Sequence, residues 1–395
     1  MQLYNTLSRE IETVKPLNGN ELRVYTCGLT VYSQPQIGNW VAYIYSDVLI
    51  RVLLKSGFDV KRIQNITDVG HLVSDDDSGE DKMEKGAKAE GKTAWDIADK
   101  YIDIADKEAY KILKLLKPDK LVRATDLIQQ QIQFAKNLEE KGYTYVIPRE
   151  GLYFDTTKFD DYGKLARLDK KGLKAGARVD IAGKKYITDF ALWKFSPTDK
   201  KRDMEWDSPW GKGFPGWHLE CSVIARESLG DQIDIHTGGI DHIPVHHTNE
   251  IAQTESLTGK QFVKYWFHNN HMKINGAKMA KSAGNSYTLN DLSERGYNID
   301  AFKLMVLTSH YRTEGNFTFE ILDAAQNRYK NWQAALDKTW QTSNEETDEL
   351  SGNLNNAKQM LLKSLQNDLN TPEALMQIDQ QVNYINEKIL GPIEA

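Results

Sequence analysis

Residues 215–250 gather side chains that could bind a metal ion. Cys221 ends the run GWHLEC, and His246 and Glu250 belong to the run HHTNE. If a helix follows Pro244, His246 and Glu250 stand four residues apart on one helix face, so that both could reach the same ion. Thiolate, imidazole and carboxylate groups are all zinc ligands. The simpler alternative is a salt bridge or hydrogen bond between His246 and Glu250, which is the commoner use of this spacing.

The chain has one other cysteine, Cys27, far away in sequence. A disulfide framework is therefore excluded in practice, and two free thiols favour a reducing cytoplasm. Residues 233–241 form an apolar run that ends in glycines, which predicts a buried strand followed by a turn. Such a strand delivers the next helix to the carboxyl end of a sheet, where open α/β sheets bind ligands.

The runs PGWHLECS and DIHTGGIDHIPVHHTNEIAQTE resemble the cysteinyl-tRNA synthetase family of class I aminoacyl-tRNA synthetases, and the similarity spans most of residues 20–310. The resemblance implies a ligase that uses ATP to activate L-cysteine as cysteinyl-adenylate and transfers it to the 3′ end of cysteine tRNA. It also implies Mg²⁺ with ATP and one Zn²⁺ per chain. On this sequence the zinc ligands would be Cys27, Cys221, His246 and Glu250.

The run KMAKS at residues 278–282 resembles the KMSKS loop of class I synthetases, with Ala280 in place of a serine. A short lysine-rich match alone is more often a solvated turn. Here it follows Asn275-Gly276, which predicts a tight hairpin turn. Lys278 and Lys281 would supply the positive charge that displacement at the ATP α-phosphate requires.

The family's His-Ile-Gly-His motif corresponds to Gln36-Ile37-Gly38-Asn39 in this chain. Gly38 is retained, and a side chain there would block the adenine base. Amides still donate hydrogen bonds to phosphate but carry no positive charge, so we expect catalysis to persist, with a possible loss of rate. The resemblance implies catalytic roles for Gln36 and Asn39 beside Lys278 and Lys281, and an ATP site that comprises Gln36, Gly38, Asn39, Gly238, Gly239, Lys278 and Lys281.

The resemblance places the bound cysteine against Thr67, Trp217 and Asp241. A carboxylate suits the α-ammonium group, and an indole forms a rigid wall. Without the motifs around them, a strand threonine, a core tryptophan and a turn aspartate would be sufficient explanations. Zinc would select cysteine over serine because it binds a soft thiolate, whereas shape alone discriminates only about 10 to 200-fold.

The formal net charge of −6 gives no general attraction to nucleic acid. Residues 164–185 are a local exception, and this basic segment is as consistent with a solvated loop as with an RNA contact; its cations are Lys164, Arg167, Lys170, Lys171, Lys174, Arg178, Lys184 and Lys185. The N-terminus lacks the apolar region of a secretory signal, and no run of 18 apolar residues predicts a membrane span. We therefore expect a cytoplasmic monomer without membrane association.

A strand at residues 22–27, a helix at 40–54 and a strand at 60–66 predict a parallel βαβ unit of Rossmann type. Residues 75–91 predict a mobile loop, and 94–116 and 124–141 two amphipathic helices. Strands resume at 232 and at 262–268, and only helix is predicted after 299, interrupted by a polar linker at 343–353. The expected domains are two catalytic halves at 1–142 and 213–298, a strand-rich insertion at 143–212 and an all-α C-terminal region at 299–395.

Two competing functions remain at this point. A ligase of the mycothiol-pathway type, which joins cysteine to an amino sugar, would share the fold and the zinc, and the short stretch after Ser343 favours it. The second is a paralogue with weakened catalysis, which is suggested because Gln36 and Asn39 stand where the family motif has histidines. Pyrophosphate exchange and tRNA charging separate the three.

Overall fold

The computed structural model describes residues 1–69, 82–168, 183–199, 201–277, 285–339 and 348–388. Within these residues the centre is a parallel sheet in the order β11-β10-β3-β4-β5. Its strands are β3 (Glu21–Thr26), β4 (Asp59–Ile66), β5 (Lys120–Arg123), β10 (Ile233–Gly239) and β11 (Val263–Asn269). The predicted Rossmann-type sheet is confirmed.

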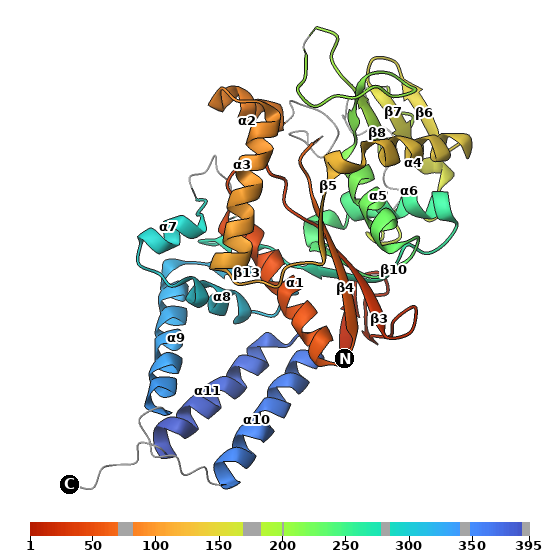
Figure 1. Cartoon of the computed structure of the whole chain (residues 1–395). Coiled ribbons are helices and arrows are strands. Elements are labelled where there is room, and N and C mark those ends of the chain that lie inside the picture. The colour runs from red at the N-terminus through yellow and green to blue at the C-terminus, as the bar shows by residue number, and fades with distance from the viewer. Residues whose placement is uncertain (70–81, 169–182, 200, 278–284, 340–347, 389–395) are drawn as a thin grey trace, which may run out of the picture.

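Helices cover both faces of this sheet (Figure 1). On one face α1 (Ile37–Lys55) and α8 (Ile299–Leu307) pack against Leu22 and Val24 of β3. On the other, Tyr25 of the same strand faces the core that includes α5 (Trp217–Leu229). The β10 to β11 crossover is α6 (His246–Thr258), so the helix predicted after Pro244 is present.

In the crossover from β4 to β5, one prediction was wrong. Residues Lys82–Glu90, expected in a mobile loop, form helix α2, because Met83 and Ala87 stand four apart and are both buried. Helix α3 (Ala94–Asp106) follows and continues into a π-helical segment, η1 (Lys107–Ile112), so the first amphipathic stretch ends earlier than predicted. Residues 75–81 lie outside the described part of the chain.

Between β5 and β10 the chain forms a second, antiparallel sheet. A short helical turn, η2 (Ala124–Leu127), and α4 (Ile128–Glu140) lead into the strands β6 (Thr144–Ile147), β7 (Gly151–Phe154), β8 (Phe190–Phe195) and β9 (Gly213–Pro215). The 3₁₀ turn η3 (Thr156–Lys158) lies between β7 and β8. Strands β6, β7 and β8 lie in the predicted insertion at 143–212, whereas β9 begins one residue after it. The division of the chain into domains stays a prediction.

After β11 the chain makes the tight turn that the Asn-Gly pair predicts. Asn275 and Gly276 both have positive φ, 50° and 75°, and Ile274 bridges Ala277 across the turn. The strand before it, β12 (Met272–Ile274), pairs in parallel with β13 (Gly315–Phe317). This second strand lies where only helix was predicted. Helix α7 (Leu289–Glu294) precedes α8.

The C-terminal part is helical, with α9 (Phe319–Thr339), α10 (Asp348–Gln366) and α11 (Thr371–Lys388), as predicted. The predicted linker is too long, since α10 already begins at Asp348. The helices α10 and α11 pair below the sheet in Figure 1 and contact the N-terminal hairpin of β1 (Gln2–Asn5) and β2 (Glu10–Thr13), where Asp368 accepts a hydrogen bond from Tyr4 N at 2.8 Å.

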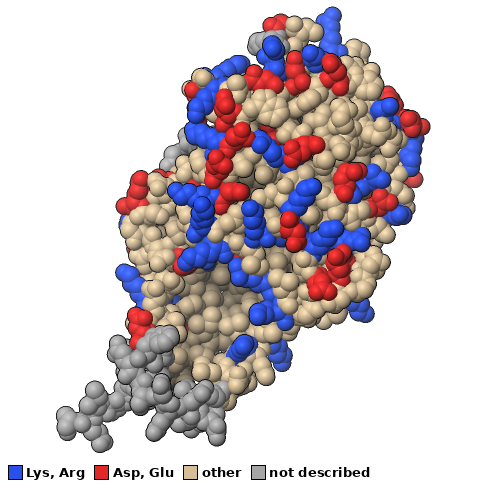
Figure 2. All heavy atoms as spheres, viewed as in Figure 1, with Lys and Arg blue, Asp and Glu red and all other residues tan. Residues whose placement is uncertain are grey.

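Helix α1 alone among the described helices is long and apolar enough to cross a membrane by composition. It lies in the core, with 61% of that apolar window buried, and Asp47 pairs with Arg51 within it at 2.7 Å. We interpret it as the central helix of the fold. On the face shown in Figure 2, basic and acidic side chains are interspersed, as the small net charge suggests.

Candidate active site

The functional residues converge because parallel strands end at one edge of the sheet. Cys27 follows β3, Thr67 follows β4, and Gly238 and Gly239 end β10. A cavity of about 650 Å³ opens at this edge. Of the residues predicted from sequence, it is lined by Cys27, Gln36, Gly38, Asn39, Thr67, Trp217, Cys221, Gly238, Gly239, Asp241 and His246.

Of the predicted site residues that the structure describes, only Glu250 does not line the cavity. Glu250 lies behind its wall, fully buried on α6. Lys278 and Lys281 lie outside the described residues, as does the middle of the basic segment 164–185. The structure therefore leaves their roles as predictions.

The four residues Cys27, Cys221, His246 and Glu250 form a cluster suited to a metal ion. Each offers one ligand atom, and these atoms lie within 4.8 Å of one another. A tetrahedral zinc ion, about 2.0 to 2.3 Å from each donor, needs donors roughly 3.3 to 4 Å apart, so only small movements separate this cluster from a bound site. Cys27 is half-buried and the other three are buried, so an ion here would be reached from the cavity side.

The two carboxylate oxygens of Glu250 have different surroundings. Oε2 pairs with His236 Nε2 at 3.0 Å. Oε1 lies 3.0 Å from His246 Nε2 yet has no hydrogen-bond partner among the described residues. A buried carboxylate oxygen without a hydrogen bond is costly, and its position beside an imidazole nitrogen and two sulfurs is that of a metal ligand.

A second grouping, Cys27, His236, His247 and Glu250, also brings its ligand atoms within 4.8 Å of one another. It fits a metal less well because both ring nitrogens of His236 already have partners. Its Nδ1 lies 3.2 Å from Thr237 O, and its Nε2 lies 3.0 Å from Glu250 Oε2. His247 Nδ1 lies 2.7 Å from His268 Nε2. We interpret His236 and His247 as residues that orient the ligands, a role that histidines and carboxylates around metal sites commonly share.

The electrostatics of the cluster favour a cation. Burial alone would raise the pKa of Glu250, but His236 and His246 outweigh it and hold that pKa at about 2. Burial would lower the pKa of His246, and the negative charges of Glu250 and Cys221 instead raise it to about 10. In the absence of a metal a protonated His246 thus supplies the positive charge, and a divalent ion can take its place.

The sequence analysis missed the buried histidines behind the cluster. His268 lies between His247 and Thr6, with its Nδ1 2.8 Å from Thr6 Oγ1, and His218 Nδ1 lies 3.0 Å from His246 Nδ1. The sequence gives no signal for these roles, because they depend on contacts that β11, α5 and α6 make only in the folded chain.

The three residues predicted to bind cysteine line the cavity beside the metal cluster. The ring of Trp217 lies 4.2 Å from that of His246, centre to centre. Thr67 is buried and accepts a hydrogen bond from Asn65 Nδ2 at 3.0 Å. The carboxylate of Asp241 is exposed to the cavity and lies over Gly239, where any added Cβ would come within 2.3 Å of its Oδ1.

Gly238 has a similar requirement. A Cβ at this position would lie 2.5 Å from His247 Cε1 and 2.7 Å from His242 Nδ1. The glycine therefore permits the imidazole rings to pack against the end of β10. The same absence of a side chain keeps the backbone open to the cavity, in accord with the predicted ATP contact.

The Gln36 to Asn39 corner begins helix α1. Asn39 Oδ1 accepts a hydrogen bond from Gln36 N at 2.8 Å, which caps the helix start. Ile37 N donates to Tyr287 O at 2.8 Å and ties the corner to the chain that follows the lysine loop. The corner thus presents a helix N-terminus to the cavity, which is a favourable place for phosphate.

Comparisons with known proteins agree with this geometry. Residues 13–327 match the model of the tRNA synthetases class I (C) catalytic domain. Cysteine–tRNA ligase 1 of Burkholderia lata is 50% identical over 82% of this chain and 69% of its own length. Cysteine–tRNA ligase of Treponema denticola is 40% identical over 96% of this chain and 80% of its own.

Among solved structures, methionyl-tRNA synthetase of Mycobacterium tuberculosis in complex with methionyl-adenylate superposes with a TM-score of 0.65. The alignment covers 95% of this chain and 86% of that one at 14% identity, which supports the fold alone. Together with the sequence relatives and the convergence of the site residues on one cavity, these matches show that the chain belongs to the cysteine–tRNA ligase family of class I aminoacyl-tRNA synthetases.

Proposed function

We propose that the chain activates L-cysteine with ATP and transfers the cysteinyl group to the 3′ end of cysteine tRNA. The observation that carries this proposal is the position of the Cys27, Cys221, His246 and Glu250 cluster in the wall of the same cavity that holds the Gln36 to Asn39 corner. One end of the cavity therefore suits a thiol and the other a nucleotide.

The metal proposed for this cluster is Zn²⁺. Two sulfurs, an imidazole and a carboxylate form a set that zinc accepts, and Glu250 Oε1, which accepts no hydrogen bond among the described residues, is the buried atom that the ion would satisfy. When bound, zinc supplies a soft Lewis acid for the substrate thiolate. Cys27, Cys221 and His246 would face the substrate, while His236 keeps Glu250 oriented from behind.

In the first step, the residues of the chain position the two substrates. Asp241 would bind the α-ammonium group of cysteine, and Trp217 would close the pocket beside the metal cluster. This leaves the cysteine carboxylate to attack the α-phosphorus of ATP, so that the bond from this phosphorus to pyrophosphate breaks and pyrophosphate leaves. Mg²⁺ bound to ATP would offset the charge of the phosphates. The helix start at Gln36 to Asn39, with Lys278 and Lys281, would stabilise the charge that develops on the phosphates.

In the second step a terminal ribose hydroxyl of the tRNA attacks the acyl group, and AMP leaves. The basic segment 164–185 is the proposed contact with the acceptor arm. We also propose that the protein acts as a monomer in the cytoplasm, where Cys27 and Cys221 would stay reduced and available to the metal.

Charging of cysteine tRNA with labelled cysteine tests the proposal. We expect cysteinyl-tRNA to form, with ATP–pyrophosphate exchange that depends on cysteine. Exchange without charging, together with transfer of cysteine to an amino sugar such as glucosamine, would favour the ligase of the mycothiol-pathway type. The absence of both activities in zinc-loaded protein would favour the paralogue with weakened catalysis.

A further inference from the structure

The π-helical segment η1 (Lys107–Ile112) places one acidic residue in an unusual position. Glu108 points inward and is 5% exposed, whereas Lys107 and Lys111 of the same segment are exposed. The extra residue in a π-helical turn shifts which side chains face the core, and such turns are frequent at functional sites. A carboxylate is rarely buried without hydrogen-bond partners that offset the free-energy cost of its desolvation.

The two partners of Glu108 flank the Gln36 to Asn39 corner. Its Oε2 accepts a hydrogen bond from Trp40 Nε1 at 2.9 Å. Its Oε1 accepts one from Gln34 Nε2 at 3.3 Å. Gln34 lines the cavity and stands two residues before Gln36, while Trp40 directly follows Asn39. One carboxylate therefore holds the chain on both sides of the Gln36 to Asn39 corner.

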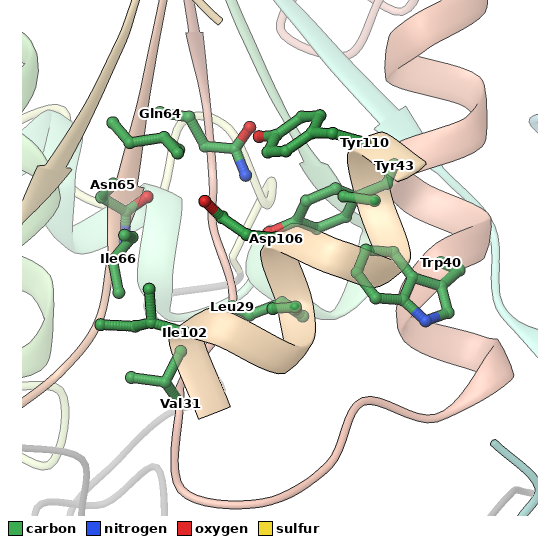
Figure 3. A pocket seen from close by; sticks show the side chains of 13 residues that line it. Leu29, Val31, Trp40, Tyr43, Gln64, Asn65, Ile66, Ile102, Asp106 and Tyr110 are labelled. Carbon is green, nitrogen blue, oxygen red and sulfur yellow. The ribbon is translucent and has the colours of Figure 1, made fainter. Parts of the chain in front are cut away.

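The Trp40 ring that donates one of these hydrogen bonds is fully buried. The Trp40 ring lies edge-on to Tyr43, 5.2 Å between centres, beside a pocket of about 30 Å³ that separates α1 from the end of α3. Figure 3 shows Trp40 and Tyr43 at one side of this pocket, facing Asp106 and Ile102. The Glu108 hydrogen bonds therefore add a polar link between α1 and η1 beside the apolar contacts of Trp40 and Ala109.

We propose that Glu108 is a positioning residue for ATP, which acts through Gln34 and Trp40 to hold the helix start that receives the phosphates. The inference rests on the proposed function, since it assumes that the corner binds ATP. It assigns no contact between Glu108 and the substrates. Burial raises the pKa of Glu108, and the Trp40 and Gln34 donors oppose this shift, which agrees with a carboxylate that acts as an acceptor.

Glu108→Leu is the primary test because it keeps the buried volume and removes both acceptors. We expect the KM for ATP in pyrophosphate exchange to rise about tenfold or more, with the KM for cysteine and the zinc content within about twofold of the unmodified chain. Glu108→Gln should recover most of the loss, since its amide oxygen can still accept from Trp40. Lys111→Leu, an exposed change on the same segment, is the matched control and should change neither KM.

Equal rises in the KM values for ATP and cysteine would overturn the inference, because they would indicate a general loss of structure. An unchanged KM for ATP in Glu108→Leu would overturn it as well. If Glu108→Leu fails to fold, Trp40→Phe removes the indole donor together with part of a fully buried ring. We expect a rise of about three to tenfold in the KM for ATP with the KM for cysteine unchanged; no rise, or an equal rise in both, contradicts the inference.

Different results would contradict the proposed function and the inference about Glu108. A zinc-loaded, unmodified chain that catalyses no exchange would contradict the proposed function. Calorimetric titration of ATP into the unmodified and Glu108→Leu proteins, without cysteine, would still decide the inference. A weaker affinity of the variant for ATP supports it, and equal affinities overturn it.

Discussion

At the scale of single residues, the metal cluster depends on four side chains whose ligand atoms lie within 4.8 Å of one another. Cys221 is buried, and its sulfur lies among Cys27, His246 and Glu250. Hydrogen bonding with Cys27 and burial hold its pKa well above the ordinary value, so a thiolate there needs a cation. The free energy of metal binding would therefore be concentrated in these four side chains.

Cys221→Ser tests that statement. We expect the metal content of the purified protein to fall from about one zinc per chain to below roughly a third, because a serine hydroxyl does not deprotonate to bind zinc. Elemental analysis measures it. Glu227→Gln, an exposed change on the same helix, should retain the metal. A variant at Cys221 with full zinc content would contradict the ligand set.

The amides at Gln36 and Asn39 carry a second prediction at this scale. If they bind the phosphates as histidines do in the family motif, changing both to histidine should alter the rate of pyrophosphate exchange by no more than about tenfold, or about 1.4 kcal/mol. Thermal unfolding is the control, since Asn39 also caps α1 through Gln36 N. A thousandfold rise in rate would show that the natural site is crippled.

At the scale of elements, Asp368 joins three parts of the fold. Its Oδ1 accepts from Tyr4 N at 2.8 Å and from Tyr311 Oη at 2.6 Å, and its Oδ2 accepts from Arg312 Nε at 2.9 Å. The residue lies between α10 and α11, is 3% exposed and has a positive φ of 54°. It therefore ties the helical pair to β1 and to the segment before β13.

Asp368→Asn should destabilise the protein by about 2 to 4 kcal/mol, because the new amide would face Arg312 while asparagine still tolerates the positive φ. Urea unfolding measures the change. Asp323→Asn is the control, since its bond to Tyr297 is exposed, and we expect a change below about 0.5 kcal/mol. A loss at Asp368 as small as that of the control would show that the helical pair docks by other contacts.

The elements also show which parts of the fold could be predicted from the sequence. Strands such as 22–27 were predictable because apolar periodicity and chain order are local signals. The parallel pair of β12 and β13 was not, since each strand has three residues and gains its hydrogen bonds from a distant partner. Helix α2 was missed because its charge and glycine outweighed the two buried positions, Met83 and Ala87.

The candidate site divides in the same way. The motifs identified the residues of the metal cluster and the cavity wall, because their order along the chain is distinctive. The roles of the supporting histidines and of Glu108 could not be predicted from motifs, because they depend on distances between strands and on the π-helical turn. Lys278 and Lys281 remain predictions from the motif.

At the scale of the whole molecule, we propose that the tRNA contacts this chain through the basic segment 164–185. We expect recognition mainly through the acceptor arm, so that a minihelix carrying this arm is charged nearly as well as full-length cysteine tRNA. The ratio of the two kcat/KM values measures it. A loss above about 10³ for the minihelix would show that α9 to α11 support contacts with the anticodon.

The central claim is that a metal held by Cys27, Cys221, His246 and Glu250 selects cysteine. The most direct test compares ATP–pyrophosphate exchange with cysteine and with serine in the zinc-loaded chain. We predict a preference for cysteine in kcat/KM above about 10³, because a soft metal ligand discriminates more strongly than shape, and loss of the cysteine activity when zinc is removed. A preference of only about 10 to 200-fold, or one that survives the removal of zinc, would contradict the account.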